Sequence, residues 1–240
     1  MKSAGGREAA KRLAGERAAE AVEDGMVVGL GTGSTAAFAI RAVGRAVDSG
    51  LSVRGVPTSF QSRALAREVG IPLAGLDEVD GLDLTIDGAD QVAIGNDGDG
   101  SDGEWGNLLK GGGAAHAREK VVAAASDRFS VVVDDSKLSD RLDGPVAVEV
   151  LPDAHAPVAS AIRELDGEPS LREGSGKDGP VVTDNGNLVL DCAFGAIADP
   201  TGLARALSSV PGVVEHGLFV EMADAVYVGS EDGVEVRKIA

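Results

Sequence analysis

The chain contains 240 residues, of which 43% are hydrophobic and 25% are charged, and its formal net charge at pH 7 is −17. This length and composition are typical of a soluble globular protein with one large domain or two modest ones. The negative charge argues against a nucleic-acid partner, because duplex binding requires a basic surface. The sequence also contains no apolar run that is long enough to cross a membrane.

The N-terminal segment and the cysteine content both favour a cytoplasmic protein. Residues 1–20 are charged and rich in alanine, without the apolar core of a signal peptide. Cys192 is the single cysteine, so the chain can form neither an internal disulfide nor a cysteine-based zinc site. We therefore expect a protein that folds in a reducing compartment.

The first part of the chain alternates helical and extended patterns. Helices are predicted at 6–23, 35–48, 60–69 and 118–125, and strands at 26–30, 53–56, 82–86 and 129–133, with 71–73 as a further candidate strand. This alternation predicts an α/β fold with a mostly parallel, doubly wound sheet and helices on both faces. Ligands of such sheets bind outside the carboxyl ends of the strands.

The pattern changes after about residue 144. Short strands are predicted at 145–150, 169–171, 181–183 and 188–191, with helices at 157–165 and 201–209. Two last strands follow at 225–228 and 234–239. We therefore expect a sheet domain made of residues 1–143 and 215–240, and a smaller α+β domain at 144–214.

An acidic, glycine-rich segment occupies residues 95–106. The spacing of its aspartates is similar to that of a calcium loop, but the ligand order and the closing bidentate glutamate are missing. A solvated loop is the better interpretation, and we predict no metal site in the chain.

Two glycine-containing turns are candidates for binding anions. The turn Gly31-Thr-Gly-Ser-Thr35 follows a predicted strand and begins a helix, where amides and hydroxyls suit a phosphate, although a simple helix cap explains it equally well. The segment from Lys110 to Lys120 combines a lysine, three glycines and Glu119 before an alanine-rich helix. Taken alone, a flexible turn is its commoner explanation.

Two further motifs follow predicted strands. Asp87 and Asp90 flank Gly88 and Ala89 at the end of strand 82–86, where one carboxylate could bind sugar hydroxyls and the other move a proton. An Asx turn explains the pair as well. Lys137 follows strand 129–133 and could reach a ligand over the sheet edge, although a solvated turn is the commoner explanation. Each motif is weak alone, but together they predict one site at the carboxyl edge of the sheet.

Several of these motifs together resemble one family, ribose-5-phosphate isomerase type A. The resemblance runs in order from about residue 7 to the C-terminus, and the lysine–glycine segment is its most specific part. The matching segments are Gly31-Thr-Gly-Ser-Thr-Ala36, Asp87-Gly-Ala-Asp90, Lys110-Gly-Gly-Gly-Ala-Ala115 with Arg118-Glu-Lys120, Asp135-Ser-Lys137, Thr183-Asp-Asn-Gly-Asn187, and Pro211-Gly-Val-Val214 with Gly217-Leu-Phe219.

The resemblance implies an isomerase of the non-oxidative pentose phosphate pathway. D-ribose 5-phosphate and D-ribulose 5-phosphate would interconvert by metal-free proton transfer through a cis-enediolate, without a cofactor. The implied fold is a Rossmann-like domain with a small α+β domain. The partner is a small sugar phosphate, and we expect a homodimer or a homotetramer.

The resemblance also assigns roles to residues. Glu119 matches the general base. On physical grounds, Lys110 with the Gly111–Gly113 amides could stabilise the developing oxyanion, and Asp87 or Asp90 could assist ring opening. The substrate-binding positions are Lys11, Thr32, Gly33, Ser34, Thr35, Asp87, Gly88, Ala89, Asp90, Lys110, Gly111, Gly112, Gly113 and Lys137.

Two other classes of protein remain as alternatives. Sugar-phosphate-sensing domains of transcription regulators have this type of fold, but they need a DNA-binding module, and the chain has no room for one before residue 26. A CoA transferase-like enzyme would need a glutamate nucleophile and a CoA site, and the sequence shows no sign of a CoA site. Incubation with ribose 5-phosphate distinguishes a sensing domain from an isomerase, because only the isomerase releases ribulose 5-phosphate.

The acidic surface leads to a prediction about salt. The excess charge is mostly aspartate, and lysine is rarer than arginine, which favours adaptation to high salt over a generally acidic surface kept for solubility. Desalting is therefore expected to lower both the unfolding midpoint and the activity, because repulsion between carboxylates is no longer screened. Unchanged unfolding and activity after dialysis into low salt would refute this hypothesis.

Overall fold

The computed structural model describes residues 8–94, 106–176 and 178–239. The chain forms two compact units: the large unit takes the described residues of 2–89, 118–138 and 221–240, and the small unit those of 90–117 and 139–220. The predicted small domain, 144–214, lies wholly within the small unit. The predicted acidic loop, apart from Gly106, lies outside the described residues.

The large unit is built on a six-stranded sheet. In the order β14-β13-β6-β3-β1-β2 its strands are Gly233–Lys238, Ala225–Ser230, Phe129–Asp134, Leu84–Gly88, Val27–Leu30 and Arg54–Pro57. All neighbouring pairs are parallel except β13 with β14. The parallel strands thus run in the doubly wound order 2-1-3-4-5, which confirms the predicted fold class and places the reversal of strand order between β1 and β3.

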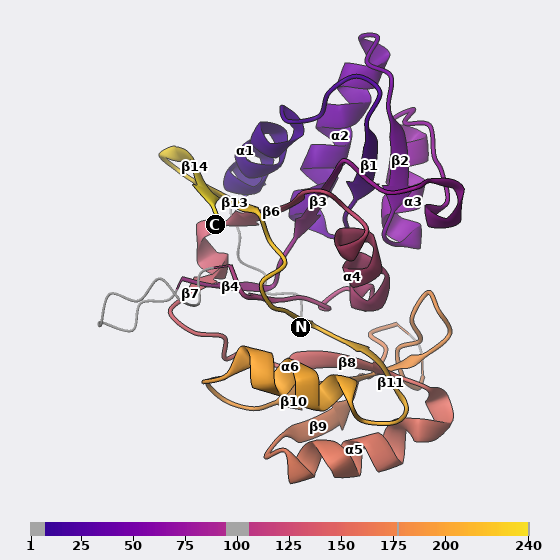
Figure 1. The fold of residues 1–240 in the computed structure, drawn as a ribbon, viewed down its shortest axis with the longest axis vertical. Helices are drawn as coiled ribbons and strands as arrows, with labels where there is room; N and C mark the ends of the chain where they lie inside the picture. The colour runs from indigo at the N-terminus through magenta and orange to yellow at the C-terminus, as the bar shows by residue number, and fades with distance from the viewer. Residues whose placement is uncertain (1–7, 95–105, 177, 240) are drawn as a thin grey trace. The chain divides into compact units, whose positions relative to one another are not determined.

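Helices cover both faces of this sheet (Figure 1). They are α1 (Glu8–Ala19), α2 (Ser34–Asp48), α3 (Phe60–Glu68) and α4 (His116–Ala124), the last of which begins in the small unit. Side chains of α1, α2 and α3 pack with Val28 and Ile86, whereas Val122 of α4 packs with Val27. Because neighbouring strand residues point to opposite faces, α4 covers the face opposite to the other three helices.

The small unit contains an antiparallel sheet in the order β11-β8-β10-β9, comprising Val213–His216, Val146–Val150, Leu188–Ala193 and Glu168–Leu171. Helices α5 (His155–Glu164) and α6 (Pro200–Ser208) pack on it through Ile162 and Leu207. Leu190 and Cys192 belong to that core, so Asp191 between them points to the opposite face of the sheet.

A second four-stranded sheet has the order β12-β5-β4-β7, formed by Leu218–Phe219, Leu108–Leu109, Gln91–Ala93 and Leu138–Ser139. None of these strands is predicted, because two or three residues are too few to show an alternating pattern. The short strand β11 was missed as well. Three 3₁₀ helices complete the described elements, at Leu76–Glu78, Asp135–Lys137 and Pro152–Ala154.

Two predicted strands are wrong. Residues 71–73 make only an isolated bridge between Leu73 and Gly55, and Pro72 lacks the amide that a ladder needs. Residues 181–183 likewise make only an isolated bridge, from Val182 to Leu188. Thr183 instead begins a turn, accepting the Gly186 amide through its carbonyl oxygen at 2.9 Å. Ile71 is buried although its segment forms no strand, whereas Val182 is 51% exposed.

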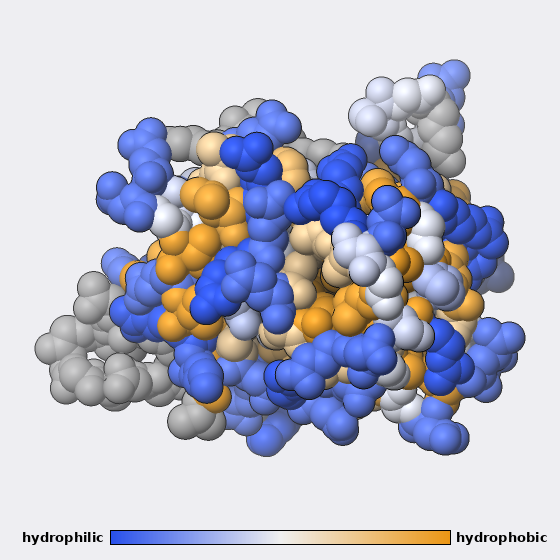
Figure 2. All heavy atoms as spheres, turned by 90° about the horizontal axis from the view of Figure 1, so that it is seen from above, coloured by the Kyte–Doolittle hydropathy of each residue, from blue (hydrophilic) through white to orange (hydrophobic). Residues whose placement is uncertain are grey.

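Figure 2 shows polar and charged side chains over most of one face of the molecule, with apolar residues in smaller patches between them. This surface agrees with the net charge of −17. Among the helices that the structure describes, none is both long and apolar enough to cross a bilayer.

Cys192 leads to a prediction about stability at alkaline pH. Burial, with a smaller contribution from the Asp191 charge, raises the pKa of its thiol to about 12. The unfolded chain therefore loses the thiol proton at lower pH than the native protein, and the stabilisation from the neutral thiol declines as the pH rises above about 8.5. Urea unfolding of wild type and Cys192→Ala between pH 7 and 10 is expected to show the wild-type advantage shrinking above that pH. Parallel pH profiles would contradict this prediction.

Candidate active site

The carboxyl ends of β1 and β3 bring two predicted motifs together. The Thr32 amide, just after β1, donates a 2.9 Å hydrogen bond to Oδ1 of Asp87, the penultimate residue of β3. The Gly88 amide donates to the same oxygen at 2.7 Å. Asp87 is only 1% exposed. The glycine turn and the aspartate therefore form one polar cluster at the switch point of the sheet, where ligands of this fold bind.

Gly31 makes this close approach possible. A Cβ atom at Gly31 would lie 2.2 Å from Oδ1 of Asp87 and 2.5 Å from its Cα atom. The Gly31 amide also donates to the Ile86 carbonyl oxygen at 3.0 Å, which keeps the two strand ends adjacent. The sequence therefore requires glycine here because of the neighbouring carboxylate, rather than because of backbone torsion.

The N-terminus of α2 has the features of an anion site. Gly33 has a φ of +104°, and the helix begins at Ser34, with Thr35 buried behind it. Nζ of Lys11 donates to Oγ of Ser34 at 3.3 Å, so a cation stands beside the free amides of the first turn. This contact brings together two of the residues predicted to bind the phosphate.

Thr58 and Ser59 belong to the same cluster but were missed in the sequence. The Thr32 hydroxyl lies 2.8 Å from that of Thr58 and donates to the Ser59 hydroxyl at 2.7 Å. Both residues are buried just after β2. Their position directly after a predicted strand was the signal that could have identified them.

Lys137 lies beyond the carboxyl end of β6, as predicted. Asp134, the last residue of β6, is fully buried and accepts a 3.1 Å hydrogen bond from the Ser136 amide. It also accepts from the Ser136 hydroxyl. This cap fixes the 3₁₀ turn Asp135–Lys137, and Lys137 itself is half-buried. Asp134, for which the sequence predicts no role, therefore determines the path of the chain that carries the lysine.

The small unit holds Lys110 by contacts within that unit. The Lys110 amide donates to the Gly217 carbonyl oxygen at 2.8 Å, and its Nζ lies 5.4 Å from the centre of the Phe219 ring. Lys110 is only 4% exposed. A Cβ at Gly217 would lie 2.1 Å from the Lys110 carbonyl oxygen, so the close pairing of β5 with β12 requires this glycine. The buried ammonium is thus fixed in position.

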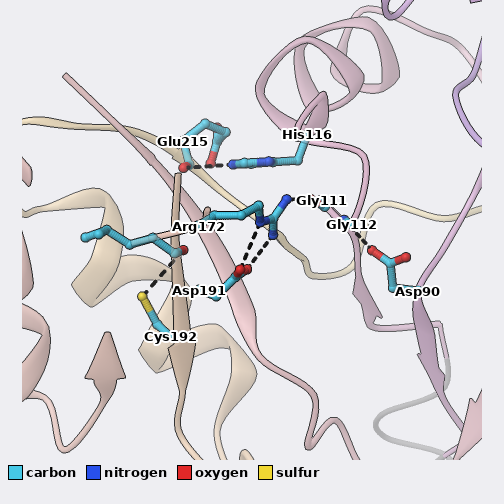
Figure 3. Close-up of polar contacts among 9 residues, drawn as sticks. Asp90, Gly111, Gly112, His116, Arg172, Asp191, Cys192 and Glu215 are labelled. Atoms are coloured by element: carbon cyan, nitrogen blue, oxygen red, sulfur yellow. Dashed lines mark hydrogen bonds and ion pairs between the residues drawn. The ribbon is translucent and has the colours of Figure 1, made fainter. Parts of the chain in front are cut away.

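The glycine triplet is also held within the small unit (Figure 3). The Gly112 amide donates to Oδ2 of Asp90 at 2.7 Å, and the Gly111 carbonyl oxygen accepts from the Ala114 amide at 2.9 Å. Gly111 has a φ of +108°, in the region that favours glycine. The Gly112 amide, one of the three predicted oxyanion donors, is thus bonded to Asp90 in this structure.

Helix α4 carries the predicted base. Glu119 lies in the first turn and is only 4% exposed. His116, the first residue of the helix, is fully buried, with its Nε2 3.3 Å from the Glu215 carbonyl oxygen. Within the described part of the chain, no group of three or more His, Cys, Asp or Glu side chains could hold a metal ion.

The structure thus assigns the predicted site residues to both units. Asp90, Lys110, Gly111, Gly112 and Gly113 belong to the small unit; Lys11, Thr32, Gly33, Ser34, Thr35, Asp87, Gly88, Ala89, Glu119 and Lys137 belong to the large one. The chain passes between units after Ala89 and after Ala117, inside two of the motifs. A switch-point anion site of this kind is typical of α/β proteins that bind phosphorylated small molecules.

Comparison with known proteins identifies the family. The chain matches the model of ribose 5-phosphate isomerase A (phosphoriboisomerase A) over residues 54–233. It is 63% identical over 236 residues to the ribose-5-phosphate isomerase A of Haloarcula marismortui, covering 98% of each chain. Its identity to the protein of the same name from Thermosynechococcus vestitus is 52% over 235 residues, covering 95% of each chain.

Solved structures agree. The ribose 5-phosphate isomerase A of Methanocaldococcus jannaschii superimposes with a TM-score of 0.88 at 43% identity, covering 95% of this chain and 98% of that one. A D-ribose-5-phosphate isomerase in complex with phospho-erythronic acid gives 0.89 at 41% identity, covering 95% and 97%. The chain belongs to the ribose 5-phosphate isomerase A family.

The contact between Gly31 and Asp87 leads to a prediction about stability. In Gly31→Ala the new methyl group must displace Asp87 or separate the ends of β1 and β3, so the free energy of unfolding is expected to fall by about 1–3 kcal/mol. Urea unfolding measures this change. Gly81→Ala is the matched control, because its Cβ would meet only the Ala125 carbonyl oxygen, at 3.6 Å. Equal stabilities of the two variants would contradict the prediction.

Proposed function

We propose that this protein interconverts D-ribose 5-phosphate and D-ribulose 5-phosphate, with Glu119 as the base that moves the proton. The observation that carries the proposal is the buried carboxylate of Glu119 in the first turn of α4, directly after the glycine segment that begins with the buried Lys110. Family membership supports the same reaction, since relatives of high identity bear its name.

The reaction needs a group that removes the C2 proton of the open-chain aldose and returns it to C1. One carboxylate on one face of a cis-enediolate can perform both transfers, so a single base suffices. Because Glu119 is shielded from solvent, the proton it carries is protected from exchange with bulk water during its transfer. Glu119 is thus suited to an intramolecular transfer that involves no metal.

The substrate phosphate is proposed to bind at the N-terminus of α2. Free amides of the first helical turn, the hydroxyls of Ser34 and Thr35, and the Lys11 ammonium all offer donors there. Lys137 would add a second cation from the end of β6. These positive groups also offset the acidic surface, which would otherwise repel a phosphorylated sugar.

Negative charge develops on the carbonyl oxygen as C2 loses its proton, and Lys110 is proposed to stabilise it. Its buried ammonium is held in place before the reaction, so no reorganisation is needed. For ring opening, Asp90 is better placed than Asp87 to exchange a proton. Asp90 is exposed and accepts the Gly112 amide through one oxygen, whereas Asp87 is buried and accepts two amides.

Two finer expectations accompany this function. We infer a homodimer or homotetramer, which light scattering of the purified protein measures directly. A cytoplasmic location agrees with a pathway that converts phosphorylated sugars, because these charged molecules do not cross membranes unaided.

The role of Glu119 gives a direct kinetic prediction. Glu119→Gln keeps the size of the side chain but removes the base, so kcat is expected to fall by about 10²–10⁴-fold, with KM changed by less than about threefold. Ribulose 5-phosphate formation measures turnover, and the transfer of deuterium from C2 of labelled ribose 5-phosphate to C1 of the product measures proton removal and return.

Glu68→Gln is the matched control, because Glu68 is exposed at the end of α3. This variant is expected to leave the rates of turnover and of proton removal unchanged. Wild-type turnover by Glu119→Gln would refute its role as base. Failure of the wild type to release ribulose 5-phosphate would refute the isomerase and favour a sugar-phosphate-sensing module. Activity lost on exhaustive chelation and restored by a divalent ion would refute the metal-free route.

A further inference from the structure

One peptide group of the glycine triplet is held from both sides (Figure 3). Nη1 of Arg172 donates to the Gly111 carbonyl oxygen at 2.7 Å. The amide of the next residue, Gly112, donates to Oδ2 of Asp90 at 2.7 Å. This carbonyl and this amide belong to the same peptide plane, so a cation and an anion fix its orientation from opposite ends.

Arg172 is itself fixed by its surroundings. Its Nε donates to Oδ2 of Asp191 at 2.8 Å, and its Nη2 pairs with the other carboxylate oxygen. Its backbone amide donates to the Val189 carbonyl oxygen at 2.9 Å, and its own carbonyl oxygen accepts the Val181 amide at 2.8 Å. The side chains of Arg172 and Asp191 are only 15% and 26% exposed. A bidentate ion pair of this kind holds the guanidinium in one plane and directs its remaining nitrogen, Nη1, toward Gly111.

The sheet of the small unit places the Arg172–Asp191 ion pair next to the glycine loop. Asp191 of β10 and Ala147 of β8 are opposite each other in the register of the two strands, on the face away from α5 and α6. A Cβ at Gly111 would lie 2.6 Å from the Ala147 side chain. Gly111 therefore rests on Ala147, next to the carboxylate that holds Arg172.

One backbone hydrogen bond, from the Ala114 amide to the Gly111 carbonyl oxygen at 2.9 Å, restrains the loop locally, and the contact with Arg172 adds to it. Gly111 and Gly112 carry no side chains that packing could lock, and glycine backbones rotate more freely than any other. Rotation of the peptide between them would turn the Gly112 amide away from Asp90. The ion pair of Arg172 with Asp191 would be complete without Gly111, so the third hydrogen bond is an additional interaction directed at the loop.

We propose that Arg172 is a positioning residue of the isomerase site. It holds the Gly111–Gly112 peptide so that the Gly112 amide orients the carboxylate of Asp90, the group assigned to proton exchange in ring opening. In this role Arg172 acts through the peptide and not by binding the substrate. The inference rests on the proposed function for its kinetic consequence, but its structural part stands on the contacts of the small unit.

Replacement of Arg172 is expected to lower kcat more than it changes KM. Arg172→Met keeps the length of the side chain and removes all its donors, so kcat for ribose 5-phosphate should fall by about 10–100-fold, with KM within about threefold, because Asp90 is misplaced while the phosphate site in the large unit is intact. Arg172→Lys keeps the charge but cannot bind Asp191 and Gly111 through one planar fork, and should give an intermediate kcat. Asp191→Asn should lower kcat in the same direction by a smaller factor.

Arg163→Met is the matched control, because Arg163 is exposed on α5 of the same unit. Urea unfolding of each variant establishes that the assays are done on folded protein. Hydrogen exchange of the 111–113 amides, followed by mass spectrometry, gives a second measurement that does not depend on turnover. These amides should exchange at least about tenfold faster in Arg172→Met than in Arg163→Met.

The outcomes separate the two proposals. An active wild type, with kcat and exchange in Arg172→Met equal to those of Arg163→Met, would overturn the role of Arg172 and leave the isomerase assignment intact. An inactive wild type would refute the isomerase, and the exchange rates of the 111–113 amides would still decide whether Arg172 holds the loop. A lowered kcat with faster exchange, partly rescued by lysine, is the result we expect.

Discussion

The hydrogen bond from the Thr32 amide to Asp87 is the contact on which the organisation of the large unit's polar residues depends. It joins the carboxyl ends of β1 and β3, the two strands between which the strand order reverses. The carboxylate fills the space that a side chain at Gly31 would occupy and satisfies amides that a tight turn would otherwise leave exposed. The direction of the glycine turn, and hence the N-terminus of α2, follows from this one buried acid.

The same constraint explains how a strongly acidic chain can bind an anionic sugar. In the proposed site the binding groups are amides at a helix N-terminus, hydroxyls, and a few lysines placed individually by the backbone. Amide dipoles carry no net charge, so they attract a phosphate without changing the overall balance of −17. Lys110 is buried beside Phe219, which keeps its charge away from the surface carboxylates. Affinity for the anion therefore depends on how the donors are arranged around it, rather than on the electrostatic field of the protein's net charge.

The sequence predicts the elements whose pattern repeats, and fails where contacts are made between distant segments. The alternation of apolar strands and amphipathic helices is sufficient to predict the parallel sheet, and the position of a motif after a strand is sufficient to place Thr32 and Asp87 at one edge. The pairing of β5 with β12 joins residues 108–109 to 218–219, and two-residue strands carry no periodic signal. Similarly, apolar residues at 71–73 and 181–183 looked like strands, because hydrophobicity alone does not show whether a neighbour is available for pairing.

Arg172 illustrates the limit of motif-based prediction for the site itself. It lies 61 residues from Gly111 in the chain, in a segment that contains none of the recognised motifs. Its contact with Gly111 arises because the register of β8 with β10 sets Asp191 opposite Ala147, and because Gly111 packs on Ala147. A glycine triplet is read in the sequence as flexible. In the structure the Ala114 amide restrains it locally, and Arg172 and Asp90, which lie at the ends of other strands, restrain it further, so the conformation of the most recognisable motif in this chain depends in part on residues outside the motif.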